Sequence, residues 1–353
     1  MNRIVLIGNG FDKAHGLPTG YSDFMNYLKN SIAEFDKKST VLKPIKHGKE
    51  CGDNSNYIHR TNNEENDRWL GVEIKKSEGK IDLKTNPHAK SIYFKSLFEE
   101  NENLGYWSDL EAHYFKLIYN NKDSAKNIDL INEEFDHLKE LLFEYLKKVE
   151  NETSYLTDLP YPIYNMLDKA QHNNFEFNEN YFITFNYTST ILNAYYNLLS
   201  REFGFDRFPL LPIHIHGELE NTKNPIIFGY GDENSEKYKE LELLQNNDLL
   251  KNFKTFQYLR STKYKQVLGL LEESDEIYIQ LIGHSSGLCD KALLRTIFQH
   301  ENVKHIEATY HKEDSKYFEN LYNISRIFDD NTLMREKIIP LNKTSMIQEY
   351  KRP

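Results

Sequence analysis

The hydrophobic pattern begins with an unbroken aliphatic run, Ile4 to Ile7. Such a run is typical of a strand buried on both faces, as in a parallel sheet. It stops at Gly8-Asn9-Gly10, where two glycines allow positive φ and a close approach of the backbone to a ligand. A helix is expected from Ser22 to Leu28, with Ser22 or Asp23 as its cap. A strand, a glycine turn and a helix in this order are typical of a nucleotide-phosphate site.

A tight turn without a ligand explains this first stretch equally well. The third glycine of the dinucleotide fingerprint is absent, because Lys13 stands at its position and Gly16 comes too late. Patterns in the rest of the chain are needed to distinguish a phosphate-binding turn from a turn without a ligand.

Four later apolar runs also end in glycine, asparagine, histidine or serine. These runs are 181–185, 212–215, 225–228 and 276–282, and 303–308 is a further strand candidate. Helical patterns at 189–199 and 290–298 separate several of them. Alternating strands and helices predict an α/β fold, with a Rossmann-like, mostly parallel sheet and a helical insertion or subdomain.

The middle of the chain has a different pattern. Residues 30–100 are polar and irregular, which indicates an insertion. A helix is expected from Trp107, with Ser108 and Glu111 as a capping box. Apolar residues then recur at helical spacing from Ile128 to Val149, which predicts a long amphipathic helix. The predicted domains are a core of 1–29 and 175–330, an insertion and helical subdomain of 30–174, and a tail of 331–353.

The polar residues that follow the apolar runs indicate where a site lies. In an open α/β sheet, ligands bind in the crevice beyond the carboxyl ends of the strands. Residues spread over most of the chain are therefore expected to meet at one sheet edge. Asn186 offers both a donor and an acceptor to a hydroxyl or a water. His216 suits a general base near neutral pH, since Gly217 opens the backbone beside it.

These residue types also suit two other kinds of chemistry. His214 and His216 form a metal site only with further ligands, which Asp12, Asp232 and Asp290 are able to supply, but no spacing demands it. The segment Gly283-His-Ser-Ser-Gly287 offers donors to a ribose or phosphate, or caps the next helix. It lacks the G-x-S-x-G spacing of a serine hydrolase. No metal is expected.

Composition narrows the class of protein. The formal net charge of −10 disfavours an extensive nucleic-acid surface, so nucleic acid is not an expected partner. Two cysteines form neither a disulfide framework nor a four-cysteine zinc site. The sequence shows neither a signal peptide nor a run of roughly 18 apolar residues. We therefore expect a cytoplasmic protein without a membrane partner.

Five ordered blocks of the sequence resemble the AbiH-type bacteriophage abortive-infection family. The opening block is Ile7-Gly-Asn-Gly-Phe-Asp-Lys-Ala-His-Gly-Leu-Pro-Thr-Gly-Tyr-Ser-Asp-Phe24. The later blocks are Trp107-Ser-Asp-Leu-Glu111, Phe185-Asn-Tyr-Thr188, His214-Ile-His-Gly217 and Gly283-His-Ser-Ser-Gly-Leu-Cys-Asp290. The resemblance implies a role in antiviral defence.

The same blocks are similar, more distantly, to the sirtuin-like NAD-consuming domains of bacterial defence systems. This resemblance implies a hydrolase that cleaves NAD(P) to nicotinamide and ADP-ribose, with NAD as substrate and Asn186 and His216 as the catalytic residues. Asp12 departs from the pattern, because such loops often carry serine there. The residues implied in nucleotide binding are Gly8, Asn9, Gly10, Phe11, Asp12, Gly16, Pro18, Thr184, Gly217, Gly283, His284, Ser285 and Asp290.

Two alternative functions stay open at this point, namely a metal-dependent nuclease of a defence system and a nucleotide-binding sensor without turnover. Divalent-ion dependence distinguishes the nuclease, and binding without activity distinguishes the sensor. The expected partners are a nucleotide, a phage-derived trigger or partner defence protein, and further copies of the chain in a homo-oligomer.

Overall fold

The computed structural model describes residues 1–36, 72–77, 80–85, 91–100, 105–152, 167, 171–172, 174–193, 211–311, 313–341 and 346–347. The chain divides into two compact units. Unit 1 comprises Met1–Thr19, Leu146–Lys239 and Asn252–Pro353, and unit 2 comprises Gly20–Tyr145 and Glu240–Lys251. The division into domains made from the sequence stays a prediction.

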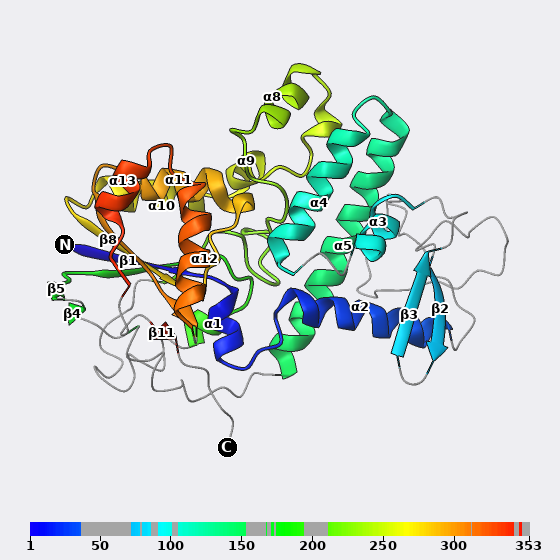
Figure 1. Cartoon of the computed structure of the whole chain (residues 1–353), viewed down its shortest axis with the longest axis horizontal. Helices are drawn as coiled ribbons and strands as arrows, with labels where there is room; N and C mark the ends of the chain where they lie inside the picture. Colours follow the sequence, from blue (N-terminus) through cyan, green and yellow to red (C-terminus); the bar gives the residue numbers. More distant parts are fainter. Residues whose placement is uncertain are drawn as a thin grey trace. The chain divides into compact units, whose positions relative to one another are not determined.

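Unit 1 contains a five-stranded sheet in the order β7-β6-β1-β8-β9 (Figure 1). The strands are β1 (Asn2–Ile7), β6 (Asn180–Thr184), β7 (Ile213–His214), β8 (Ile277–Ile282) and β9 (Val303–Ala308). Every neighbouring pair in this sheet is parallel. All six residues of β8 are buried, as the continuous apolar run predicts for a central strand. The predicted Rossmann-like α/β fold is confirmed.

The order of the strands places a topological switch beside β1. From β1 the chain passes to β6 and β7 on one side, and then to β8 and β9 on the other. Strand connections that diverge in this way open a crevice beyond the carboxyl ends of the strands. The loops after β1 and β8 lie at that point.

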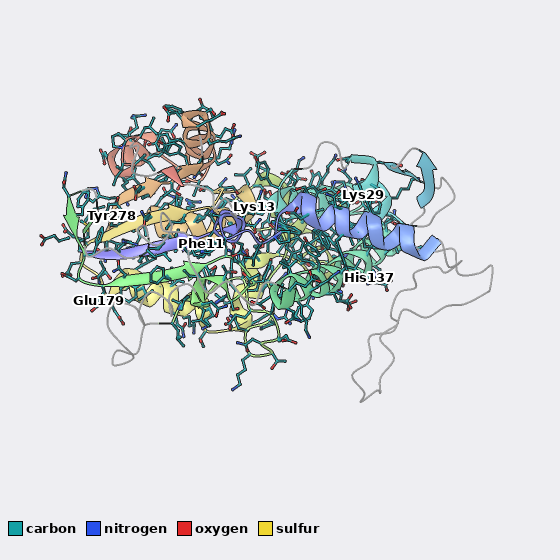
Figure 2. All side chains as sticks on the ribbon, turned by 90° about the horizontal axis from the view of Figure 1, so that it is seen from below. Phe11, Lys13, Lys29, His137, Glu179 and Tyr278 are labelled. Carbon is teal, nitrogen blue, oxygen red and sulfur yellow. The ribbon has the colours of Figure 1, made fainter. Side chains whose placement is uncertain are left out.

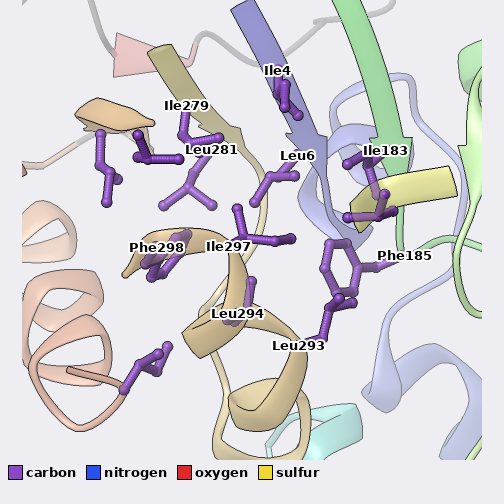
Figure 3. Packing of buried hydrophobic residues seen from close by; sticks show 14 of the residues in the cluster. Ile4, Leu6, Ile183, Phe185, Ile279, Leu281, Leu293, Leu294, Ile297 and Phe298 are labelled. Atoms are coloured by element: carbon purple, nitrogen blue, oxygen red, sulfur yellow. The ribbon is translucent and has the colours of Figure 1, made fainter. Parts of the chain in front are cut away.

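One face of the sheet packs against α10 (Lys263–Glu272) and α11 (Lys291–Phe298). Figure 3 shows side chains from β1, β6 and β8 meeting those of α11, with Leu6, Leu281 and Ile297 near the centre. The opposite face carries a smaller apolar cluster around Val5, Ile7 and Phe182. Removal of this apolar surface from water is the main force that holds the sheet and helices together.

A short helix, α1 (Asn9–Ala14), follows β1 directly and was not predicted from the sequence. Figure 2 labels Phe11 in this helix, and Phe11 is fully buried in the smaller apolar cluster. The helix contains Gly10, whose low helix propensity hides the element in a sequence pattern. Unit 1 also contains β4 (Gln171–His172), β5 (Phe175–Glu176), α9 (Lys254–Gln257), η5 (Tyr258–Arg260), η6 (Leu288–Asp290), β10 (Tyr310–His311), α12 (Asp314–Ser325), α13 (Asn331–Lys337) and β11 (Met346–Ile347).

Unit 2 is mainly helical, and α5 and α8 run across its sequence boundaries. Its elements are α2 (Tyr21–Asp36), β2 (Val72–Ser77), β3 (Lys80–Thr85), α3 (Tyr93–Glu100), α4 (Trp107–Asn120), α5 (Ala125–Glu152), α8 (Glu236–Leu243) and η4 (Asn247–Leu249). The strands β2 and β3 form an antiparallel hairpin. The predicted long helix is confirmed as α5, and its apolar stripe from Ile128 to Val149 is buried.

The caps predicted for two helices differ from those in the structure. The Asp23 carboxylate accepts a hydrogen bond from the Gly20 N–H (3.0 Å), but α2 begins at Tyr21, so Asp23 lies inside the first turn and the prediction of Ser22 or Asp23 as the cap residue is wrong. The predicted Ser108–Glu111 capping box is wrong. The helix α4 begins at Trp107 with Tyr106 as its N-cap, so Ser108 lies inside the helix. Asp109 accepts from the N–H groups of Gly105 and Tyr106, both at 2.8 Å.

The predicted strand at 225–228 is also wrong, because this segment contains no strand. The segment 225–228 runs beside His216 and forms one backbone hydrogen bond with it, from Ile227 N to His216 O (2.7 Å). Pro225 has no N–H group and so donates no further backbone bond. The helix expected at 189–199 is described only to residue 193. Of the irregular 30–100 segment, residues 37–71, 78–79 and 86–90 lie outside the described residues.

Candidate functional site

The glycines after β1 and β8 pack directly against each other. A Cβ on Gly8 would lie 2.5 Å from the Cα of His284, and one on Gly10 would lie 2.7 Å from the Cα of Gly283. Gly10 N donates to Gly283 O (2.8 Å), Gly8 N to Ile282 O (2.9 Å) and Phe11 N to Gly8 O (2.9 Å). These glycines therefore serve the close approach of two loops, and three backbone N–H groups near the switch point are engaged by the protein.

Asp12, Asn186 and Thr188 form the first polar group at the carboxyl edge, called here the Asp12 cluster. Asn186 Nδ2 donates to Asp12 Oδ1 (2.9 Å) and to Gly8 O (3.1 Å). Thr188 Oγ1 donates to Asp12 Oδ2 (2.7 Å). Because a backbone carbonyl only accepts hydrogen bonds, the contact with Gly8 O fixes which end of the Asn186 amide is the NH₂ group. Asn186 thus keeps Oδ1, an acceptor, for a ligand.

The carboxyl group of Asp12 is 1% exposed and has no cation among its partners in the described residues. Burial raises the pKa of Asp12 from its ordinary 3.8 to about 6, while hydrogen bonds from Thr188, Thr190 and Asn186 oppose the rise. Glu150 adds to the rise through its negative charge. The cluster therefore holds a carboxyl group whose pKa, about 6, lies well above that of an ordinary aspartate.

Asp290, His216, His284 and Lys254 form the second polar group, called the Asp290 cluster. Lys254 Nζ donates to Asp290 Oδ1 (2.7 Å), and His216 Nε2 lies 3.2 Å from the same oxygen. His284 Nε2 lies 3.5 Å from Asp290 Oδ2. Lys254 is 1% exposed, so an ammonium group is held almost completely out of water beside the carboxylate. Tyr258 Oη also lies 3.2 Å from His216 Nε2.

The charges in the Asp290 cluster set the protonation of its members. Burial alone would raise the pKa of Asp290, but the charge of Lys254 and the contacts with His216 and His284 hold it well below its usual value. Burial, and after it the charge of Lys254, lower the pKa of His216 to about 4 against the opposing effect of Asp290. At neutral pH the cluster therefore contains an ion pair and a neutral His216.

The two clusters lie beside consecutive residues at the end of β6, Phe185 and Asn186. Phe185 lies in the large apolar cluster, with its ring centroid 5.0 Å from that of His216 and 4.2 Å from that of His284. The next residue, Asn186, belongs to the Asp12 cluster. Because Thr184 pairs with His214 in the sheet, Asn186 and His216 each follow their strand pair by two residues. Their side chains enter separate hydrogen-bond networks and do not contact each other within the described residues.

The other predicted site residues take different positions. Gly16, with φ +81°, and Pro18 follow the C-terminal end of α1 and are exposed. The Ser285 side chain is exposed, and its carbonyl accepts from Asn323 Nδ2 (2.9 Å). Asn9 Oδ1 accepts from Thr19 Oγ1 (2.5 Å).

Thr184 and Gly217 support neighbouring parts of the backbone. Thr184 Oγ1 accepts from Asn186 N (3.1 Å) and so holds the turn into the Asp12 cluster. Gly217, with φ +91°, lets the chain turn against Pro225, whose carbonyl oxygen would lie 2.3 Å from a Cβ at position 217. His214 Nδ1 lies 3.3 Å from Asn186 O, so His214 is a buried structural neighbour of the site.

Lys254 and Tyr258 are the main site residues that the sequence does not reveal. Both come from a segment that belongs to no sheet strand and carries no motif. The segment is brought in by a parallel bridge between Tyr230 and Phe253 and by the close packing of Gly231 against Cys289 O. The glycines of the 229–232 stretch were the only local signal that two backbones approach closely here.

No group of three or more His, Cys, Asp or Glu residues in the described ranges has an arrangement that holds a metal ion. No helix in the described part of the chain has the length and apolar character needed to cross a membrane.

The fold and the two clusters together define a Rossmann-like α/β protein with polar groups gathered at its strand-end crevice. The family model described as bacteriophage abortive infection AbiH matches residues 4–312, and the chain belongs to this family. No curated protein and no solved structure matched the chain.

Proposed function

We propose that this abortive-infection protein hydrolyses NAD(P) to nicotinamide and ADP-ribose at the carboxyl edge of its sheet. The observation that carries the proposal is the placement of Asn186 and His216 at equivalent positions after two adjacent parallel strands. Both residues lie where an open α/β sheet binds its ligands. The resemblance to sirtuin-like NAD-consuming domains supports the same substrate.

In the proposed reaction Asn186 orients a donor on the sugar or the attacking water. Its Oδ1 is the atom left for this task, because Nδ2 is engaged by Asp12 and Gly8. A group held in this way costs little reorganisation when the substrate arrives. The contact does not depend on the backbone N–H groups that the two glycine loops already use.

His216 acts in this proposal as the general base. Its neutral imidazole accepts a proton from water while the water oxygen bonds to the ribose carbon. The carbon–nitrogen bond to nicotinamide breaks, and its electron pair leaves with the neutral nicotinamide. The products are ADP-ribose, nicotinamide and one proton, which His216 passes to solvent. General base catalysis of this kind contributes about 10²- to 10⁴-fold.

The nuclease alternative places a metal ion near His216 and Asp290. In the structure the ammonium group of Lys254 already neutralises Asp290 at the oxygen that also faces His216. A cation at this oxygen would be repelled by Lys254. The charge arrangement therefore favours the hydrolase over the nuclease.

The test is the release of nicotinamide from NAD and NADP by the purified full-length protein in the presence of EDTA. We expect activity in the wild type and a loss of about 100-fold or more in His216→Gln and in Asn186→Ala. Matched controls are His305→Gln and Asn302→Ala, which change residues in and next to the amino-terminal half of β9. Both controls should retain activity within a few-fold.

Three other results would redirect the assignment. Activity that survives both site substitutions would remove the proposed catalytic pair. Cleavage of nucleic acid that requires a divalent ion would establish the nuclease. Binding of NAD without turnover, with the binding retained in both variants, would establish the sensor.

A further inference from the structure

Asp290 is the point at which the buried charges of the site converge. Its Oδ1 contacts both Lys254 Nζ (2.7 Å) and His216 Nε2 (3.2 Å), and its Oδ2 faces His284 Nε2 (3.5 Å). The Asp290 side chain is 15% exposed, whereas those of Lys254 and His216 are 2% and 6% exposed. A carboxylate with three such partners has little capacity left to bind a ligand directly.

The contact with Asp290 determines which nitrogen of His216 carries the proton. An ionised carboxylate only accepts hydrogen bonds, so the nitrogen that faces it must be an N–H group. In a neutral imidazole the other nitrogen, Nδ1, is then a bare acceptor. Tyr258 Oη lies 3.2 Å from the same Nε2, where it is a second acceptor for this N–H group.

The two histidines beside Asp290 are not equivalent. His284 Nδ1 accepts a hydrogen bond from Ser286 N (3.0 Å), and its Nε2 faces Asp290. Both nitrogens of His284 are therefore engaged by the protein. His216 Nδ1, by contrast, has no hydrogen-bond partner among the described residues. Only His216 has a ring nitrogen ready for substrate or water.

We propose that Asp290 and Lys254 are positioning residues that hold His216 as its Nε2–H tautomer, so that Nδ1 accepts the proton from the attacking water. This inference rests on the proposed function. In the step, a water O–H bond breaks and an Nδ1–H bond forms. The imidazolium that results is stabilised by the Asp290 carboxylate, and the proton then passes from Nδ1 to solvent.

Lys254 has a separate effect on the same ring. Among the described residues, the charged and titratable groups that face His216 are Lys254 from α9, Tyr258 from η5, His284 from the loop after β8, Asp290 from η6, and Tyr187 from the segment after β6. Without Lys254 only burial and His284 would oppose the negative charge of Asp290, so the proton affinity of His216 would rise. The lysine thus keeps His216 unprotonated and available as a base at neutral pH.

The first test measures the tautomer without any substrate. Long-range ¹H–¹⁵N spectra of the full-length protein at pH 7 distinguish protonated from bare ring nitrogens, and the His216→Gln variant assigns the signal by its loss. We expect a protonated Nε2 and a bare Nδ1 at His216. A protonated Nδ1, or a doubly protonated ring, would overturn the proposal. This readout is independent of NAD turnover, so it separates a failure of the inference from a failure of the proposed function.

The second test changes the charge at position 254. In Lys254→Met the titration midpoint of His216 should rise by at least one pH unit, about tenfold in proton affinity. Lys254→Arg keeps the charge and should leave the midpoint low. The matched control is Lys337→Met, since Lys337 is a buried lysine that donates to the carbonyls of Phe298 and His300.

The outcomes of the second test are distinct. A midpoint that rises in Lys254→Met alone supports the proposal, even if the protein does not hydrolyse NAD. A midpoint that stays unchanged in Lys254→Met overturns the role of Lys254. If Lys254→Met does not fold, the Lys254→Arg midpoint and the wild-type tautomer still decide the matter, because a high midpoint or a protonated Nδ1 contradicts it.

Discussion

Two aspartates at the same sheet edge differ in their electrostatic environment. Asp12 is enclosed with hydroxyl and amide donors, and burial raises its pKa to about 6. Asp290 is enclosed with an ammonium group and two imidazoles, and these hold its pKa well below the usual value. Burial acts in the same direction on both, so the lysine accounts for much of the difference.

The two aspartate clusters therefore have different roles at the site. The Asp290 cluster keeps a permanent ion pair that orients His216, and this pair persists across the physiological pH range. The Asp12 cluster orients Asn186 through a carboxyl group that gains a proton as pH falls towards 6. The Asp290 cluster sets the protonation state of His216, and the Asp12 cluster sets the position of the Asn186 side-chain amide.

The largest expected effect comes from removing the cation of the Asp290 cluster. Lys254→Met should lower the free energy of unfolding by about 3–5 kcal/mol at pH 7, because it leaves a mostly buried carboxylate without its cation. The double variant Lys254→Met/Asp290→Asn should recover part of this loss. Chemical denaturation measures both values. A loss below about 1 kcal/mol would show that Asp290 is solvated better than its contacts indicate.

Removing the charge of Asp12 is expected to raise the free energy of unfolding instead of lowering it. The folded pKa of Asp12 lies above its unfolded value, so the folded state binds more protons between about pH 4 and 6, and stability falls as pH rises through this window. Asp12→Asn should therefore increase the unfolding free energy by about 3 kcal/mol at pH 8, and the gain should vanish towards pH 4. Denaturation at both pH values checks this, and a variant destabilised equally at both would contradict it.

The loop contact that joins the clusters gives a third test. Gly283 has φ +66°, and a Cβ there would lie 2.4 Å from Phe11 N. Gly283→Ala should cost about 2 kcal/mol, because the left-handed backbone and the clash both oppose it. The matched control is Gly269→Ala, which has open space around it within α10 and should stabilise by about 0.5–1 kcal/mol. Thermal unfolding compares the two, and equal changes would show that the loops relax freely.

The sequence allowed the fold and part of the site to be predicted for identifiable reasons. Continuous apolar runs are a strong signal for buried parallel strands, and β1, β6 and β8 were found in this way. The strand β9 lacks such a run and was predicted only as a further candidate at 303–308. The polar residues after the runs at 181–185 and 212–215 predicted that Asn186 and His216 lie at one sheet edge, and these residues follow the paired strands β6 and β7. The run at 225–228 carried the same signal without forming a strand, because Pro225 and the turn at Gly217 prevent a backbone ladder.

Other features depend on contacts that no local pattern encodes. Lys254 becomes part of the site through the packing of the 229–232 stretch. Because most lysines are exposed, the sequence alone predicts a surface position for it. The separation of Asn186 and His216 into two networks is equally hidden. It arises because the chain leaves β7 in a turn, so that His216 faces Asp290 while Asn186 faces Asp12.

The most direct test of the account is the pH dependence of nicotinamide release, measured as kcat/KM over the range in which the protein stays folded. If His216 is the base, the rate should decline only as pH falls towards its pKa of about 4. This acid limb should remain in Asp12→Asn and move to higher pH in Lys254→Met. A limb near pH 6 that disappears in Asp12→Asn would instead make Asp12 the base and contradict the account.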